Sequence, residues 1–201
     1  SATIIDEGCQ RIGQTPTTVF YAAYALALAY MSGERRVAFY TFNHGRGDRR
    51  LTDHVYGHYL TSLPIIIDTD PGQTVTELLN QAHRELFCSM RYRIYPEYHL
   101  LREIGLDDGA EMGYNANNIP EYINIDGKLW NTHHIDPSLT GEHTSTYITR
   151  RESLYEVFTD CSSALYTQEQ IDILSELIGQ MALLLVGDQN ETLKNIIPKK
   201  K

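Results

Sequence analysis

The sequence predicts an α/β fold, a layered sandwich in which helices pack on a mixed β-sheet. Three segments carry the apolar spacing or the capping residues of helices, and short runs of β-branched and aromatic residues lie between them. These segments do not alternate in the simple order of a doubly wound fold. The 201 residues, 42% hydrophobic and 21% charged, suit a single globular domain over 1–198, followed by a basic tail at 199–201.

The first predicted helix spans residues 16–32. Thr15 supplies a capping hydroxyl before a proline, and Gly33 suits the left-handed residue that ends a helix. The apolar run 37–42 then predicts a strand, which we interpret as buried on both faces. A second strand is predicted over 63–67, where a Pro-Gly pair soon forces a turn.

Two capping boxes mark the starts of two amphipathic helices. In each, a threonine hydroxyl and a Glu or Gln three residues later satisfy each other's backbone N–H groups. The first box, Thr74 and Glu77, opens a helix that runs to about Arg91. The second, Thr167 and Gln170, opens a helix that we expect to pack on the sheet.

A β-hairpin and a strand pair are predicted between these helices. The dipeptide Asp126-Gly127 is a favoured two-residue hairpin turn, and short apolar runs at 122–125 and 128–130 flank it. Two further strands, at 145–149 and 154–159, are separated by a polar turn, so we expect them to pair.

Composition excludes several classes of function. The formal net charge of -9 argues against a nucleic-acid partner. Cys9, Cys88 and Cys161 are widely spaced, so we expect neither a disulfide framework nor a zinc site. The longest apolar run, 19–31, is too short to span a membrane, and no signal peptide is recognised. We therefore expect a cytoplasmic protein that has no membrane partner.

The histidines do not follow a metal-binding pattern. His54 and His58 stand four apart, but the glutamate of the zinc helix is missing, so we interpret them as surface or interface residues. His133, His134 and Asp136 fit no zinc spacing and suggest a polar loop without a structural metal. No nucleophile elbow or phosphate-binding glycine loop is present either, so no catalytic residue is predicted within the chain.

The glycine-flanked Arg46 lies in a polar loop after the first strand, within an Arg-Gly-Asp triplet. Because three residues recur easily by chance, cell adhesion is the least favoured interpretation. An ion pair that fixes the loop is favoured, and an arginine that faces a ligand stays open.

Four features occur in a characteristic order between Thr15 and Ile104. A helix is followed by a strand that ends near Gly-Arg, by Tyr-Gly-His-Tyr-Leu-Thr-Ser-Leu-Pro at 56–64, and by Tyr-Pro-Glu at 95–97. This order resembles the second half of condensation domains in nonribosomal peptide synthetases, whose core motifs read Val-Gly-x-Phe-x-Asn-Thr-Leu-Pro and Leu-Pro-Phe-Glu. Two departures are the replacement of the family asparagine by Thr61 and the absence of Arg-Asp-x-Ser-Arg-Asn near 106–114.

The resemblance implies one lobe, the C-terminal one, of a chloramphenicol acetyltransferase-like fold. In that fold two α/β lobes form a V around a tunnel. An amine on one peptidyl carrier protein attacks an acyl or peptidyl thioester on another, and an amide bond forms. The implied partners are the N-terminal lobe and the carrier proteins. Their phosphopantetheine arms carry the substrates, and no cofactor is expected to bind this chain directly.

The resemblance also implies that the chain is inactive by itself. The family's catalytic motif, His-His-x-x-x-Asp-Gly, belongs to the N-terminal lobe, which the 201 residues beginning at Ser1 are not expected to include. His133 and His134 do not replace it, because Ser138 and Leu139 stand where the motif needs Asp and Gly. The candidates for the tunnel wall are Arg46, His58, Thr61 and Ser62.

Two alternatives remain open. One is a related acyltransferase lobe from an epimerising, cyclising or ester-forming enzyme. The other is a non-catalytic module that binds carrier proteins or a partner lobe. The residues encoded upstream of Ser1 would distinguish each of these two alternatives from the condensation enzyme.

Overall fold

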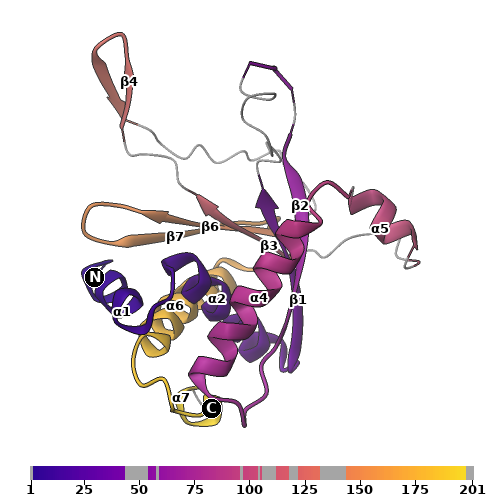
Figure 1. Cartoon of the computed structure of the whole chain (residues 1–201), viewed down its shortest axis with the longest axis vertical. Helices are drawn as coiled ribbons and strands as arrows, with labels where there is room; N and C mark the ends of the chain where they lie inside the picture. The colour runs from indigo at the N-terminus through magenta and orange to yellow at the C-terminus, as the bar shows by residue number, and fades with distance from the viewer. Residues whose placement is uncertain are drawn as a thin grey trace.

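The computed structural model describes residues 2–43, 54–57, 59–95, 97–103, 105, 112–117, 122–131 and 144–197, and shows helices layered on a sheet (Figure 1). Within these ranges the helices are α1 (Ala2–Ile12), α2 (Pro16–Ser32), α4 (Val75–Arg91), α5 (Glu97–Glu103), α6 (Gln168–Leu185) and α7 (Leu193–Ile196). The strands are β1 (Arg36–Asn43), β2 (Thr61–Asp68), β3 (Met112–Asn117), β4 (Tyr122–Ile125), β5 (Lys128–Asn131), β6 (Thr144–Arg150) and β7 (Tyr155–Asp160). The predicted α/β sandwich is confirmed.

The described strands of the main sheet follow the order β2-β1-β3-β6-β7. β1 is antiparallel to β2, from the pair Arg36 and Asp68 to the pair Asn43 and Thr61. β3 runs parallel to β1 and β6. β7 pairs with β6, as predicted, and the structure shows that the pair is antiparallel. The sheet is therefore mixed. β2 lies at its edge, where Pro64 is tolerated because it has no N–H for a further strand.

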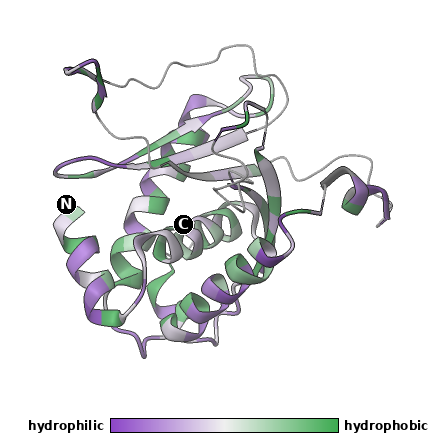
Figure 2. Ribbon diagram, turned by 45° about the horizontal axis from the view of Figure 1, so that its top comes forward, coloured by the Kyte–Doolittle hydropathy of each residue, from purple (hydrophilic) through white to green (hydrophobic). Residues whose placement is uncertain are grey.

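Helix α2 begins and ends at its predicted capping residues. Thr15 Oγ1 accepts a hydrogen bond from the Thr18 N–H at 3.2 Å. Gly33 has a φ of 81°, a left-handed conformation that glycine adopts without steric cost, and its N–H donates to the Ala29 carbonyl. Figure 2 shows hydrophobic residues concentrated in this helical layer and a hydrophilic tip on the β6–β7 pair.

A cluster of aromatic rings joins α2 to the middle of the sheet. The Tyr21 and Tyr114 ring centroids are 4.5 Å apart, and Tyr24 meets Phe39 edge-on at 5.0 Å. The buried Tyr24 hydroxyl donates to the Gly113 carbonyl at 3.2 Å, so its polar end is satisfied. These rings form the centre of the core.

Both predicted capping boxes are confirmed. The Thr74 N–H donates to Glu77 Oε2 at 2.7 Å, and the Thr167 N–H donates to Gln170 Oε1 at 2.9 Å. α4 packs on β2 and α2, and α6 packs mainly on α2. The two amphipathic helices therefore cover the same face of the sheet as α2 (Figure 1).

Helix α1 was not predicted from the sequence. Gly8 lies in its middle and is a poor helix former. Tertiary packing explains the glycine, because a Cβ there would lie 2.6 Å from the Val186 Cβ. Arg11 Nη2 also donates to the Val186 carbonyl at 2.5 Å, so α1 docks closely on the end of α6.

The predicted hairpin is confirmed as a separate two-stranded sheet, β4–β5. Its turn residues Asp126 and Gly127 have φ values of 51° and 80°, as the turn type requires. Asn124 Oδ1 accepts a hydrogen bond from the Gly127 N–H at 2.9 Å. Figure 1 shows the hairpin standing away from the body, and the residues 122–130 are exposed.

The second face of the main sheet is not covered by any described helix. Val37 and Phe39 are buried against the helices, whereas Ala38 between them is exposed. On β2, Ile66 is likewise exposed between buried neighbours. The prediction that the first strand is buried on both faces is therefore correct in the middle of β1, where Phe39, Tyr40 and Thr41 are all buried, and wrong at Ala38. We call this uncovered side the open face.

Candidate functional site

Two of the four predicted wall residues, Thr61 and Ser62, begin strand β2. Thr61 pairs with Asn43, so both residues lie at the corner where β1 ends. Arg46 and His58, the other two wall candidates, lie outside the described residues. The structure thus places half of the predicted set together at one end of the edge strand.

A cavity of about 370 Å³ lies beside Ser62. Ser89 Oγ donates to the Pro64 carbonyl at 2.7 Å, which holds the end of α4 against the edge strand and forms one wall. The lining is mostly apolar, with hydroxyls on its border, and suits a neutral group. The lining residues are Ser62, Leu63, Pro64, Cys88, Ser89, Tyr92, Tyr95 and Leu100.

The Thr61 hydroxyl oxygen is buried and has no hydrogen-bond partner among the described residues. A buried hydroxyl without a partner costs about 1–3 kcal/mol. Such an oxygen at the predicted wall is a polar group available to a ligand or to another part of the enzyme. The resemblance of residues 56–64 to the family core motif indicated only that threonine replaces asparagine at this position.

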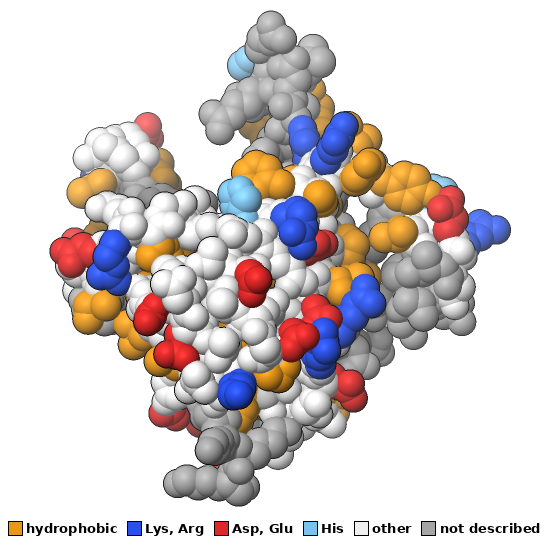
Figure 3. All heavy atoms as spheres, turned by 60° about the horizontal axis from the view of Figure 1, so that its bottom comes forward, with side chains coloured by type: hydrophobic (Ala, Val, Ile, Leu, Met, Phe, Trp, Pro, Cys, Tyr) orange, Lys and Arg blue, Asp and Glu red, His pale blue; other side chains and the backbone are white. Residues whose placement is uncertain are grey.

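Exposed hydrophobic side chains surround the end of α4. Phe87, Tyr92, Ile94 and Tyr95 form what we call the α4-end patch, and Ile94 is 85% exposed. Figure 3 shows hydrophobic side chains gathering beside basic side chains, and the basic residues near the end of α4 are arginines, among them Arg91 and Arg93. Grouped exposed hydrophobic residues are characteristic of interaction surfaces.

Helix α5, which supplies one wall of the cavity, was not predicted. It has only seven residues and no capping box, so neither its period nor its ends are distinctive. The one signal was the Tyr-Pro-Glu stretch at 95–97, which resembles a family core motif. Tyr95 donates to Glu103 Oε1 at 2.7 Å, and this hydrogen bond is the main cause of the raised pKa of the Tyr95 hydroxyl.

The shifted pKa values of the described cysteines and core tyrosines indicate burial rather than catalysis, whereas those of Arg35 and Asp68 follow from the hydrogen bond between the two side chains. Burial raises the pKa of the Cys9 thiol to about 11 and also raises that of Cys161. The phenol of Tyr114, buried in the aromatic core, has a pKa well above its ordinary value for the same reason. Thiols that stay protonated near neutral pH are poor nucleophiles, so neither Cys9 nor Cys161 is a candidate nucleophile.

Metal-ligand candidates do not gather within the described ranges. No described group of three or more His, Cys, Asp and Glu residues could hold a metal ion. His54 is exposed, as predicted for a surface histidine, whereas His133, His134 and Asp136 lie outside the described residues. Among the helices that the structure describes, none has the length and apolar character needed to cross a membrane.

Comparison with protein families gives a match over more than half of the chain. The family model described as "Condensation domain" matches residues 2–117. The matched segment runs from α1 through β3, so it includes Thr61, Ser62 and the walls of the adjacent cavity.

One curated protein shows local sequence similarity. Malpinin synthetase of Mortierella alpina is 35% identical over 75 residues, which are 37% of this chain and 1% of that protein. The similar segment is therefore a very small part of the synthetase.

Solved structures share the fold. A variant of the starter condensation domain of rhizomide synthetase RzmA has a TM-score of 0.75 at 21% identity, covering 90% of this chain and 43% of its own. The first condensation domain of the CDA synthetase has a TM-score of 0.75 at 17% identity, covering 95% of this chain and 44% of its own. The chain thus spans less than half the length of these two structures.

Proposed function

Because the chain belongs to the condensation-domain family, we propose that it is the C-terminal lobe of a nonribosomal peptide synthetase condensation domain. The observation that carries this proposal is the coverage, since 90% of this chain aligns with only 43% of a solved condensation domain. A second lobe of similar size is then the main partner. Peptidyl carrier proteins would present the substrates on phosphopantetheine arms.

The proposed reaction joins an amine to a thioester. The amine nitrogen attacks the carbonyl carbon, a C–N bond forms, and the C–S bond to the donor arm breaks. The amine loses a proton, and the donor arm leaves as a thiol. The base that would take the proton belongs to the histidine motif of the other lobe, because Ser138 and Leu139 break that motif here.

This lobe would therefore act by positioning. Two tethered reactants held in the right geometry can react as if one were present at about 10⁵ M or more. The buried Thr61 hydroxyl and the adjacent Ser62 would offer hydrogen bonds to amide groups of an incoming arm or acyl chain. The apolar cavity beside Ser62 would take a neutral part of the same substrate.

Three surfaces of the chain support a partner lobe. The open face leaves Ala38 and Ile66 exposed, the α4-end patch adds further hydrophobic side chains, and the β4–β5 hairpin exposes Leu129 and Trp130. A two-stranded hairpin is only marginally stable alone in water. A second lobe would cover such surfaces and remove their apolar area from water.

The test is complementation of the two lobes. The chain is incubated with loaded donor and acceptor carrier proteins, with and without the upstream lobe, and the amide product is measured by mass spectrometry. We expect product only when both lobes are present. Product from this chain alone would refute the proposal, whereas carrier binding without any product in the two-lobe sample would favour the non-catalytic module.

Variants test the proposed wall. In the two-lobe enzyme, Thr61→Val and Ser62→Ala should each lower the rate by about tenfold, the value of one lost hydrogen bond in a buried site. Ser163→Ala, in an exposed turn before α6, is the matched control and should leave the rate unchanged. Equal rates in all three variants would remove Thr61 and Ser62 from the wall.

A further inference from the structure

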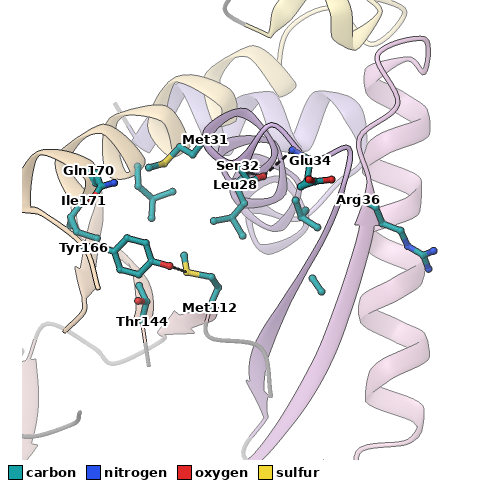
Figure 4. A pocket seen from close by; sticks show the side chains of 13 residues that line it. Leu28, Met31, Ser32, Glu34, Arg36, Met112, Thr144, Tyr166, Gln170 and Ile171 are labelled. Atoms are coloured by element: carbon teal, nitrogen blue, oxygen red, sulfur yellow. Dashed lines mark hydrogen bonds between the residues drawn. The ribbon is translucent and has the colours of Figure 1, made fainter. Parts of the chain in front are cut away.

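A second cavity, of about 370 Å³, lies near the beginning of β1, away from Thr61 and Ser62 (Figure 4). β3 pairs with β1 only at Tyr40 and Thr41, so the first half of β1 has no described strand beside it on that side. The cavity occupies this space between the sheet and the helices α2 and α6. It is distinct from the cavity beside Ser62.

The walls of this second cavity are mainly aliphatic or thioether side chains. Met31 and Met112, at two sides of it, are flexible and can adapt to different shapes. The apolar lining residues are Leu28, Met31, Val37, Ala38, Met112, Ile171 and Leu174.

Two polar side chains at the rim, Ser32 and Gln170, are already hydrogen-bonded within the protein. Ser32 Oγ donates to the Leu28 carbonyl at 2.8 Å, and the Gln170 side chain accepts the capping hydrogen bond from Thr167. Figure 4 shows Glu34 and Arg36 at the opposite side of the cavity from Thr144, with the Arg36 side chain extending away. The charged residues therefore do not line the part of the wall near Thr144.

Thr144 is the polar lining residue whose side-chain oxygen is both buried and without a described partner. Its exposed fraction is 0%, and its Oγ1 has no hydrogen-bond partner within the described chain. Tyr166 and Met112 lie beside it in Figure 4, joined by a hydrogen bond from the Tyr166 hydroxyl to the Met112 sulfur at 3.7 Å. A fully buried hydroxyl without a partner is unfavourable, and here it borders a cavity in which a ligand could satisfy it.

We propose that this cavity binds a neutral, mainly aliphatic small molecule whose single polar group forms a hydrogen bond with Thr144 Oγ1. The volume lies within the range of small-molecule pockets, and the aliphatic walls favour an aliphatic ligand. A charged head group would be buried without a counter-ion beside Thr144, which is costly. The site goes beyond the proposed condensation function and does not depend on it.

The experiment uses the intact chain with ¹³C-labelled methionine methyl groups and 1-octanol as the probe. The four methionines report separate places: Met31 and Met112 line the cavity, Met181 is in the core, and Met90 lines a different hollow on α4. We expect saturable shifts at Met31 and Met112 only. Shifts that fail to saturate, or that are equally large at Met90, would overturn the proposal.

Two variants test the contacts. Leu174→Trp should fill the cavity and abolish the shifts, whereas Leu183→Trp, on the exposed side of the same helix, should leave them unchanged.

Thr144→Val keeps the shape and removes the hydroxyl, so octanol should bind about tenfold more weakly. Octanoate, the charged probe, should also bind at least about tenfold more weakly than octanol. Unchanged octanol affinity in Thr144→Val would refute the proposed hydrogen bond. Equal affinity of the natural chain for octanoate and octanol would refute the preference for a neutral head group.

Discussion

The helix-covered face of the main sheet and the β4–β5 hairpin are held together in different ways. Phe39 and Tyr114 at the covered face are at most 1% exposed and contact the aromatic rings of α2, whereas Leu129 in the hairpin is 70% exposed. The covered face therefore has a complete core of its own. The hairpin leaves hydrophobic residues exposed within the described chain, as the proposed function, in which a second lobe covers them, would require.

The largest difference should appear when an aromatic residue is removed from each region. Phe39→Ala should lower the free energy of unfolding by about 3–5 kcal/mol, because it leaves a cavity among packed rings. Trp130→Ala, at an exposed hairpin position, should change it by less than about 0.5 kcal/mol in the isolated chain. Urea unfolding followed by circular dichroism measures both. Similar losses from the two variants would contradict a separation between core and hairpin.

A smaller effect should follow from two glycine substitutions in helices that belong to the covered side. Gly8→Ala should destabilise the fold by about 1–3 kcal/mol, because the new Cβ would overlap Val186. Gly179→Ala in α6 is the matched control. No atom lies within 4 Å of its added Cβ, so it should stabilise the helix by about 0.5–1 kcal/mol. Thermal unfolding of both variants tests the close approach of α1 and α6. Equal shifts of the two melting temperatures would contradict that approach.

The buried Cys9 thiol should make the covered side sensitive to alkaline pH. Its pKa is about 11 in the fold, above its ordinary 9.0, so the unfolded chain loses this proton first as the pH rises. The contribution of the protonated Cys9 thiol to the free energy of unfolding is therefore fully present below about pH 9. It declines toward pH 11, by roughly 2 kcal/mol at most.

The buried tyrosines add their own loss above about pH 10, so the cysteine contribution is read as a difference. Urea unfolding at about pH 8 and about pH 10.5 should show a weaker decline in Cys9→Ala than in the natural chain. Cys88→Ala, which removes an exposed thiol, should follow the natural chain. An identical decline in all three proteins would show that Cys9 does not contribute.

The hairpin itself should show the smallest free energy of opening. Its backbone amides should exchange with solvent far faster than those of α4, because β4 and β5 pair only with each other within the described chain and their side chains are exposed. Hydrogen exchange followed by mass spectrometry measures this. Under the proposed function, adding the partner lobe should slow exchange in the hairpin and leave α4 unchanged. Protection of the hairpin equal to that of α4 in the isolated chain would count against the comparison.

Local chemistry determined most elements before any tertiary contact was considered. The limits of α2 follow from a threonine cap, a proline and Gly33, and the hairpin turn follows from Asp126-Gly127, because each requires only a particular backbone geometry. The capping boxes likewise located α4 and α6. For the candidate site, the order of short motifs indicated Thr61 and Ser62 as wall residues. Their chemical role stays a prediction.

Tertiary structure alone decided what those elements face. The apolar run of β1 could not reveal that Ala38 is exposed, because the coverage of each face depends on where distant helices pack. Gly8 weakens α1 locally, yet the close contact with Val186 accounts for it. The hydroxyls of Thr61 and Thr144 are buried without a partner within the described chain. The cavities beside Ser62 and Thr144 are lined by residues far apart in the sequence. Hydrogen-bond satisfaction and cavity shape are properties of packed neighbours, and a pattern along one chain does not contain them.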